Sequence, residues 1–173
     1  MIKSEQIEFE NDRLILKVKK PSLFVLILSF GMSFLFLLLP IIVLMAIMST
    51  SDGENPLHFM HFVFLAIPFS FGVFLLRISL WNYYGKEVYN FGQENLEYFA
   101  DYNWFKDSVK SMKMSDLYFL FKIYNENDNV GQLLISDGQS EIESVIKLPV
   151  DDLEKLVNRL ESKYLIIEEE FKL

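Results

Sequence analysis

Two histidines form the residue pair in this chain that comes closest to a metal-binding pattern. His58 and His61 are the only histidines and stand three positions apart, which places them on one face of a predicted helix. With a carboxylate from Asp52 or Glu54 they could hold a metal ion at the outer surface. We favour the simpler interpretation, in which both histidines are polar residues at the start of a helix and hold no metal.

Most other kinds of chemical site lack the residues that they need. The sequence contains no cysteine, which excludes disulfides, thiolate zinc sites, iron–sulfur clusters and cysteine nucleophiles. It also contains no glycine-rich phosphate loop, no nucleophile elbow and no His-Glu-x-x-His zinc helix. Acid–base catalysis by two carboxylates stays open, but no spacing indicates such a pair. We therefore predict a protein that is not an enzyme and that carries no cofactor.

Three further groups of residues have both a functional and a structural interpretation. Arg77 and Trp81 follow an apolar segment and are interpreted as interfacial anchors, with a gating or lipid-binding role for Arg77 as the alternative. Gly85-Lys86-Glu87 could contact a ligand, but we interpret it as a joint between a helix and a strand, because glycine eases the bend. The aromatic residues of the third group could form a partner surface, although we expect core packing: Tyr98, Phe99, Tyr102, Trp104 and Phe105.

Two long apolar segments must position these residues. The first runs from Leu23 to Met48 without a charge, and the second runs from His58 to Leu76. As helices they would measure about 39 and 28 Å, and the hydrocarbon core of a bilayer is about 30 Å thick. We predict transmembrane helices over residues 21–48 and 57–81, joined by an external loop at 49–56, with a kink at Pro40. A cleaved signal peptide would be shorter and would begin nearer the N-terminus.

The basic residues near the ends of these segments predict their orientation. The loop at 49–56 contains no lysine or arginine. Four basic residues precede the first segment and two follow the second: Arg13, Lys17, Lys19 and Lys20, then Arg77 and Lys86. Cytoplasmic loops are enriched in lysine and arginine. Both termini are therefore expected in the cytoplasm and the loop outside, in the cytoplasmic (inner) membrane.

Small residues predict how the two spans pack. Ser29 and Ser33 lie four positions apart in the first span, and Ala66 and Ser70 lie four apart in the second. Counted from the cytoplasmic ends, Ser29 matches Ser70 in depth and Ser33 matches Ala66. We expect these pairs to face each other within one hairpin; the alternative is that they serve contacts between copies of the chain.

The remaining residues predict a small β domain. Residues 6–18 alternate apolar and polar side chains around the turn Asn11-Asp12, which predicts a hairpin within a cytoplasmic segment at 1–20. Residues 82–173 hold further strand patterns, a hairpin signal at Asp137-Gly138 and an amphipathic helix that begins at Pro149. The predicted fold class is membrane α + β. A transmembrane helix hairpin precedes a small antiparallel sheet, which the N-terminal hairpin joins and the C-terminal helix caps.

The segment after the second apolar run resembles part of a known group of proteins. Leu80-Trp81-Asn82-Tyr83-Tyr84-Gly85-Lys86-Glu87 is similar to the segment that follows the second span in uncharacterised bacterial two-span membrane proteins with a C-terminal pleckstrin-homology-like (PH-like) domain. The layout of residues 14–164 is similar as well. The resemblance implies bacterial origin, a PH-like domain and no known activity. It does not extend to phosphoinositide binding, because this chain lacks the basic strand residues with which many PH domains hold those lipids.

The charge distribution restricts the partners of the β domain. Residues 82–173 hold ten basic and eighteen acidic residues. Such a domain is unsuited to nucleic acid or to a polybasic grip on anionic lipid. We expect a scaffold or small subunit of a membrane assembly, whose partners are the lipid bilayer and either another protein or further copies of the chain. The alternative is a ligand-sensing effector that oligomerises through its spans.

Overall fold

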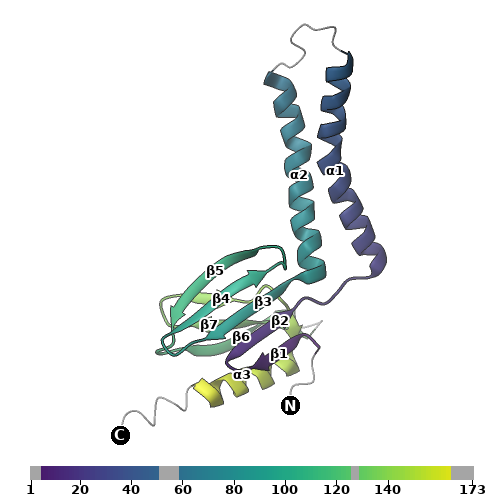
Figure 1. Cartoon of the computed structure of the whole chain (residues 1–173). Helices are drawn as coiled ribbons and strands as arrows, with labels where there is room; N and C mark the ends of the chain where they lie inside the picture. The colour runs from purple at the N-terminus through teal and green to yellow at the C-terminus, as the bar shows by residue number, and fades with distance from the viewer. Residues whose placement is uncertain (1–4, 51–58, 126–128, 165–173) are drawn as a thin grey trace. The chain divides into compact units, whose positions relative to one another are not determined.

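The computed structural model describes residues 5–50, 59–125 and 129–164. The chain forms two compact units (Figure 1). One unit, which we call the β unit, comprises Met1–Lys19 and Gly85–Leu173 and contains every described strand. The other, which we call the helical unit, comprises Lys20–Tyr84 and contains two long helices. The architecture is therefore α + β, as the sequence predicts.

The helical unit is a hairpin of α1 (Leu23–Thr50) and α2 (Phe59–Tyr84), which pack against each other. Both helices are long and apolar enough to cross a membrane. α1 begins two residues later than the sequence predicts, and α2 ends three residues later, so α2 continues up to Gly85. Most of the predicted loop at 49–56 lies outside the described residues.

The seam between the helices follows a spacing of alternately three and four residues. The less exposed positions on α1 recur at Leu26, Phe30, Ser33, Leu37, Pro40, Leu44 and Ile47. Those on α2 recur at His61, Leu65, Pro68, Gly72, Leu75 and Ser79. An average spacing of 3.5 residues is that of helices packed as in a left-handed coiled coil. Both prolines thus lie on the faces that the helices turn toward each other.

The β unit begins with a five-stranded antiparallel sheet in the order β1-β2-β3-β4-β5. Its strands are β1 (Ile7–Glu10), β2 (Arg13–Lys17), β3 (Lys86–Phe91), β4 (Asn95–Asp101) and β5 (Lys106–Lys113). Leu14 lies opposite Tyr89 and Leu16 opposite Glu87. This register confirms that the N-terminal hairpin joins the sheet formed after the second helix. The hairpin turns at Asn11 and Asp12, whose φ angles of 46° and 61° suit a tight hairpin turn.

A second sheet follows, instead of the single antiparallel sheet that the sequence predicts. It contains β6 (Tyr118–Asn125), β7 (Val130–Ser136), β8 (Glu141–Glu143) and the short β9 (Leu148–Pro149). β5 does not pair with β6, and the chain turns between them at Asp116, where φ is 61°. The hairpin signal at Asp137-Gly138 is confirmed: it joins β7 to β8, and Gly138 has a φ of 81°.

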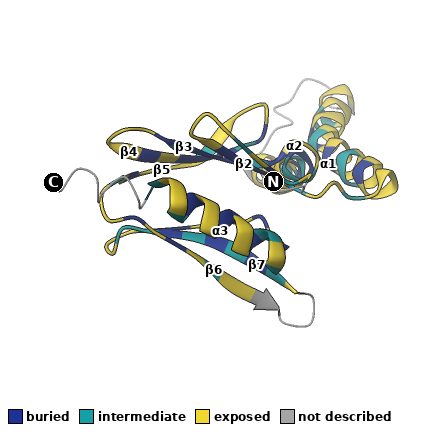
Figure 2. Cartoon of the chain, turned by 90° about the horizontal axis from the view of Figure 1, so that it is seen from below, coloured by how far each residue is buried: buried dark blue, intermediate teal, exposed yellow. Residues whose placement is uncertain are grey.

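The helix α3 (Val150–Tyr164) lies between the two sheets (Figure 2). Its apolar face is buried as predicted, and the buried residues are Leu153, Leu156, Val157 and Leu160. At the C-terminal end of α3 the Tyr164 ring stacks on Phe91 of the first sheet at 4.5 Å and lies 6.2 Å from Phe119 of the second. The helix therefore closes the core from one side by contacting both layers.

Candidate functional site

Glu87, at the start of β3, is a fully buried carboxylate that joins the two sheets. Its side chain is 0% exposed. The Tyr98 hydroxyl donates a hydrogen bond to Oε1 at 2.7 Å. The backbone N–H groups of Val145 and Ile146 donate to Oε1 and Oε2 at 2.9 and 3.0 Å. Since Val145 and Ile146 belong to the loop between β8 and β9, this one side chain ties the first sheet to the second.

The electrostatics of Glu87 reflect a balance between burial and hydrogen bonding. Burial raises the pKa of the carboxyl group, and the hydrogen bonds from Tyr98, Val145 and Ile146 oppose part of that rise. Burial and the nearby Glu87 charge also raise the pKa of both Tyr98 and Tyr89. The Tyr89 hydroxyl is buried without a hydrogen-bond partner among the described residues. Because the carboxylate is sealed from solvent, the arrangement is suited to holding a loop rather than to acting on a substrate.

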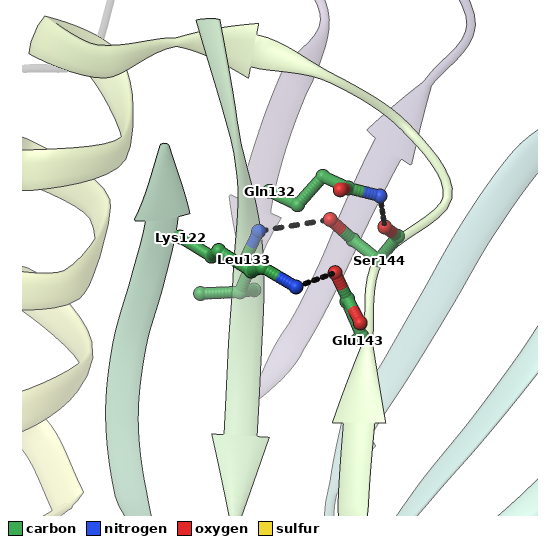
Figure 3. A network of polar contacts seen from close by, with 5 residues as sticks. All are labelled: Lys122, Gln132, Leu133, Glu143 and Ser144. Atoms are coloured by element: carbon green, nitrogen blue, oxygen red, sulfur yellow. Dashed lines mark hydrogen bonds and ion pairs between the residues drawn. The ribbon is translucent and has the colours of Figure 1, made fainter. Parts of the chain in front are cut away.

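A second polar network fixes the same loop from the side of the second sheet (Figure 3). The Gln132 side-chain amide donates to the carbonyl oxygen of Ser144 at 2.6 Å. The Ser144 hydroxyl, itself buried, accepts a hydrogen bond from the backbone N–H of Leu133 at 2.9 Å. An exposed ion pair joins Lys122 to Glu143 at 3.8 Å and adds little stability. The loop between β8 and β9 is therefore held from both layers.

The Ser144 network also explains why β8 is only three residues long. β8 ends at Glu143, after which the hydroxyl of Ser144 bonds the β7 backbone and donates to the carbonyl of Ile146 at 3.1 Å. A side chain that bonds the backbone locally competes with the strand ladder. The chain leaves β7 there and pairs with it again only at β9.

The other residues of the predicted joint also serve the β unit. Gly85 lies between α2 and β3, and its carbonyl accepts a hydrogen bond from Val18 at 3.0 Å. Lys86 is the first residue of β3, and its ammonium lies 3.3 Å from the carboxylate of Asp101. Gly85, Lys86 and Glu87 therefore begin the sheet at the position where the chain leaves α2, and Glu87 carries the structural contact that spacing alone did not reveal.

The predicted metal site falls mostly outside the described part of the chain. His58, Asp52 and Glu54 belong to residues 51–58, and His61 lies half-buried on α2. Within residues 5–50, 59–125 and 129–164, no group of three or more histidine, aspartate or glutamate residues could hold a metal ion. The metal interpretation therefore stays a prediction.

The two predicted anchors lie four residues apart near the end of α2. Arg77 is exposed and Trp81 is half-buried. Three further residues of α2 follow Trp81, and the ring of Tyr83 lies 5.3 Å from the ammonium of Lys20. This end of the helical unit thus carries basic and aromatic side chains together, a composition typical of a membrane interface.

The predicted pairing of small residues between the spans is wrong. Ser33 is buried opposite Ser79, with 3.3 Å between the hydroxyl oxygens, and not opposite Ala66. Ala66 and Ser70 are exposed and line a shallow groove on the outer side of α2, and Ser29 donates to a carbonyl of its own helix. The prediction matched residues of α1 and α2 by counting inward from Leu23 and Leu76. This count gave the wrong register between the two helices, because α2 extends past Leu76 to Tyr84.

Gly72 is the small residue that the spacing argument missed. A Cβ atom at this position would lie 2.9 Å from the backbone nitrogen of Leu37. Glycine therefore allows α2 to approach α1 closely, as small residues do in membrane helix pairs. The signal was present in the sequence, since Pro68, Gly72 and Ser79 share one face of the helix.

The aromatic group divides into buried and exposed members. Tyr98, Phe99 and Tyr102 are buried, which agrees with the expected core packing. Trp104 and Phe105, in the turn between β4 and β5, remain 65% and 40% exposed. These two side chains are the members of the group that are available to a partner.

Comparison with known proteins adds no assignment. No family model, curated protein or solved structure matches this chain. The functional argument therefore rests on the geometry described above.

Proposed function

We propose that this protein is a membrane-anchored interaction module: two helices cross the bilayer, and a PH-like domain is presented on the cytoplasmic side to a protein partner. The observation that carries the proposal is the exposure of large apolar side chains on the outward faces of both helices. A bilayer accounts for such a surface, whereas soluble monomers rarely expose apolar patches of this size. The basic residues at the ends of the spans support the cytoplasmic position of both termini in the inner membrane.

The layout of the β unit supports the PH-like part of the proposal. Two antiparallel sheets enclose a core that a C-terminal helix closes from one side. That element order agrees with the family resemblance of the segment around Trp81 and Gly85. The buried Glu87 functions as a structural tether between the sheets, and the protein is not an enzyme.

The outer face of the second sheet is the surface that we assign to the partner. β6 stands at the end of its sheet and pairs only with β7 among the described strands. Tyr118 and Leu120 point outward from it and are 56% and 53% exposed. An apolar edge strand of this kind is a template for strand addition or for docking of another protein. The partner would then be part of the membrane assembly in which this protein acts as a scaffold or small subunit.

Site-specific photo-crosslinking tests this proposal in the intact membrane. A photoreactive amino acid at Leu120 should give one defined protein adduct, and Tyr118→Asp should abolish it. The matched control is Glu97, which is exposed on β4 of the other sheet and should give no such adduct. Equal adducts at both positions, or none at Leu120, would argue against a partner surface on β6.

The second candidate function is a ligand-sensing effector that oligomerises through its spans. The specific observation in its favour is that Ala66 and Ser70 lie on the exposed side of α2, where small residues could admit a helix from another copy. Purification in mild detergent separates the two functions. Homo-oligomers with a bound small molecule would favour the effector, and a stoichiometric protein partner would favour the interaction module.

A further inference from the structure

The turn between β4 and β5 presents an aromatic tip on a rigid support. The Tyr102 backbone N–H donates to the carbonyl of Phe105 at 3.0 Å and closes the turn. The rings of these two residues stack at 4.5 Å with an interplanar angle of 14°. Asn103 takes a φ of 71°, and its N–H is held by the Asp101 side chain at 2.8 Å. Trp104 therefore projects from a backbone held by these contacts and is the most exposed aromatic side chain of the turn.

The register of the sheet places this tip at a particular end of the β unit. Lys86, the first residue of β3, lies opposite Asp101, and Asp101 lies opposite Lys106. The turn between β4 and β5 therefore lies at the end of the sheet where β3 begins. Gly85 comes straight after the last residue of α2. On the neighbouring strand, Lys17 lies opposite Lys86, and the chain leaves there toward α1. The aromatic tip thus lies at the end of the sheet where both connections to the long helices are made.

A second exposed apolar residue is fixed at the same end by an independent contact. Val145 is 59% exposed, although its backbone N–H is bound to the carboxylate of Glu87. Glu87 is the residue after Lys86, so its tether holds the loop between β8 and β9 at this end of the domain. The buried carboxylate of Glu87 therefore also holds Val145 at the end of the β unit where β3 follows α2 in the chain.

The chemistry of this end matches the boundary between lipid headgroups and acyl chains. Tryptophan is enriched there because its ring is apolar and its indole N–H is polar. Two lysines lie at the same end of the sheet: Lys86, whose ammonium lies 3.3 Å from the carboxylate of Asp101, and Lys106, whose ammonium lies 4.2 Å from the Phe99 ring centroid. The contact depends on apolar insertion at one end of the β unit, so it does not require a net positive charge on the unit as a whole.

We propose that the turn at 102–105, together with Val145, inserts into the lipid interface of the leaflet at which α2 ends. Trp104 enters the headgroup–acyl boundary, with Phe105 at its side. The β unit would then be held against the bilayer by its own surface as well as by its two chain connections. The proposal rests on the membrane-spanning function proposed above.

The chain contains two tryptophans, Trp81 and Trp104, which allows a direct test. The full chain is placed in phosphatidylcholine liposomes with or without bromine at shallow acyl positions, since bromine quenches tryptophan only at contact range. Trp81→Phe leaves Trp104 as the single tryptophan, and Trp104→Phe leaves Trp81. We expect the fluorescence of Trp104 to fall in brominated lipid by about the fraction lost by Trp81, because both belong at the interface.

The outcomes separate this proposal from the proposed function. Quenching of Trp81 without quenching of Trp104 would overturn the insertion of the tip and leave the membrane spans intact. Quenching of neither would reject the spans as well. Because Trp81→Phe alters the helical unit, a second measurement uses the cysteine-free chain with Trp104→Cys and a polarity-sensitive label. Its matched control is Gln93→Cys in the exposed turn between β3 and β4, at the opposite end of the same sheet. A lipid-like environment at position 104 alone supports the proposal, and equal water exposure at both positions contradicts it.

Discussion

The helical unit and the β unit place their large apolar side chains in opposite ways. In the helical unit, Phe24 is 74% exposed, and the outward faces carry phenylalanine, leucine and isoleucine throughout. The same unit turns the hydroxyls of Ser33 and Ser79 inward, toward each other. In the β unit, Leu14 and Leu16 are fully buried, and the described charged residues other than Glu87 are exposed or half-buried. The difference teaches that the two parts of one chain are built for different solvents: water around the β unit and, in our proposal, hydrocarbon around the helices.

The largest expected effect comes from a charge placed inside the β unit. Leu16 is fully buried opposite Glu87, so Leu16→Asp would bury a second carboxylate beside the first. An uncompensated buried charge costs about 3–5 kcal/mol. Limited proteolysis of the full chain should therefore show loss of protection over residues 87–164. Val109→Asp on the exposed face of β5 is the control and should keep the protection. Equal resistance in both variants would show that the β1–β2 hairpin does not support the core.

A charge on the outside of the helical unit should also be costly, in contrast to an ordinary exposed position. Leu38 is exposed near the middle of α1. If hydrocarbon surrounds this side chain, Leu38→Asp should reduce membrane insertion by about 2.5–3.5 kcal/mol. A glycosylation-based insertion assay measures the effect, with Leu38→Ala as the control. Unchanged insertion of the aspartate variant would show that α1 does not lie in the bilayer.

Close packing within the helical unit gives a smaller effect. Gly72→Ala would place a Cβ atom 2.9 Å from the Leu37 backbone, and overpacking typically costs about 1–3 kcal/mol. We expect slower disulfide formation between cysteines introduced at Ser33 and Ser79, which face each other in the seam. Gly31→Ala is the matched control, because a Cβ there meets nothing within 4 Å. Equally rapid crosslinking with Gly72→Ala, with Gly31→Ala and with neither substitution would contradict the close approach of the helices at Gly72.

Replacing Glu87 should change how the free energy of unfolding depends on pH, and this effect should be smaller than those above. Because burial raises its pKa, the folded protein takes up a proton at a pH where the unfolded chain is mostly ionised. This contribution to the free energy of unfolding is fully present below the ordinary pKa of 4.5 and is lost as the pH rises through the higher pKa of the folded state. Glu87→Gln should flatten that decline in denaturant unfolding experiments repeated at several pH values. An identical slope in both proteins would mean that Glu87 titrates alike when folded and unfolded.

The elements with strong periodicity could be predicted from the sequence. The long uncharged runs gave both helices, and the apolar positions of α3 gave its buried face, because period and length decide these features locally. The turns at Asn11-Asp12 and Asp137-Gly138 could also be predicted locally, because such turns need residues that accept positive φ.

The features that depend on contacts between distant residues could not be predicted. Glu87 meets Val145 and Ile146 across almost sixty positions, and no spacing encodes that encounter. The pairing of Ser33 with Ser79 depends on where α2 ends, and the apolar run placed that end too early. The chain passes from the first sheet to the second at a turn that contains Asp116, and no glycine or proline stands beside this residue to mark the boundary in the sequence.

The central claim is that the helices span a membrane with both ends of the chain on the cytoplasmic side. The native chain has no cysteine, so single-cysteine variants report one position each. Ser51→Cys, between the two helices in sequence, should react with a membrane-impermeant maleimide in intact cells. Ser162→Cys, exposed on α3, should react only after lysis. Labelling of position 162 in intact cells, or protection of position 51 until lysis, would contradict the account.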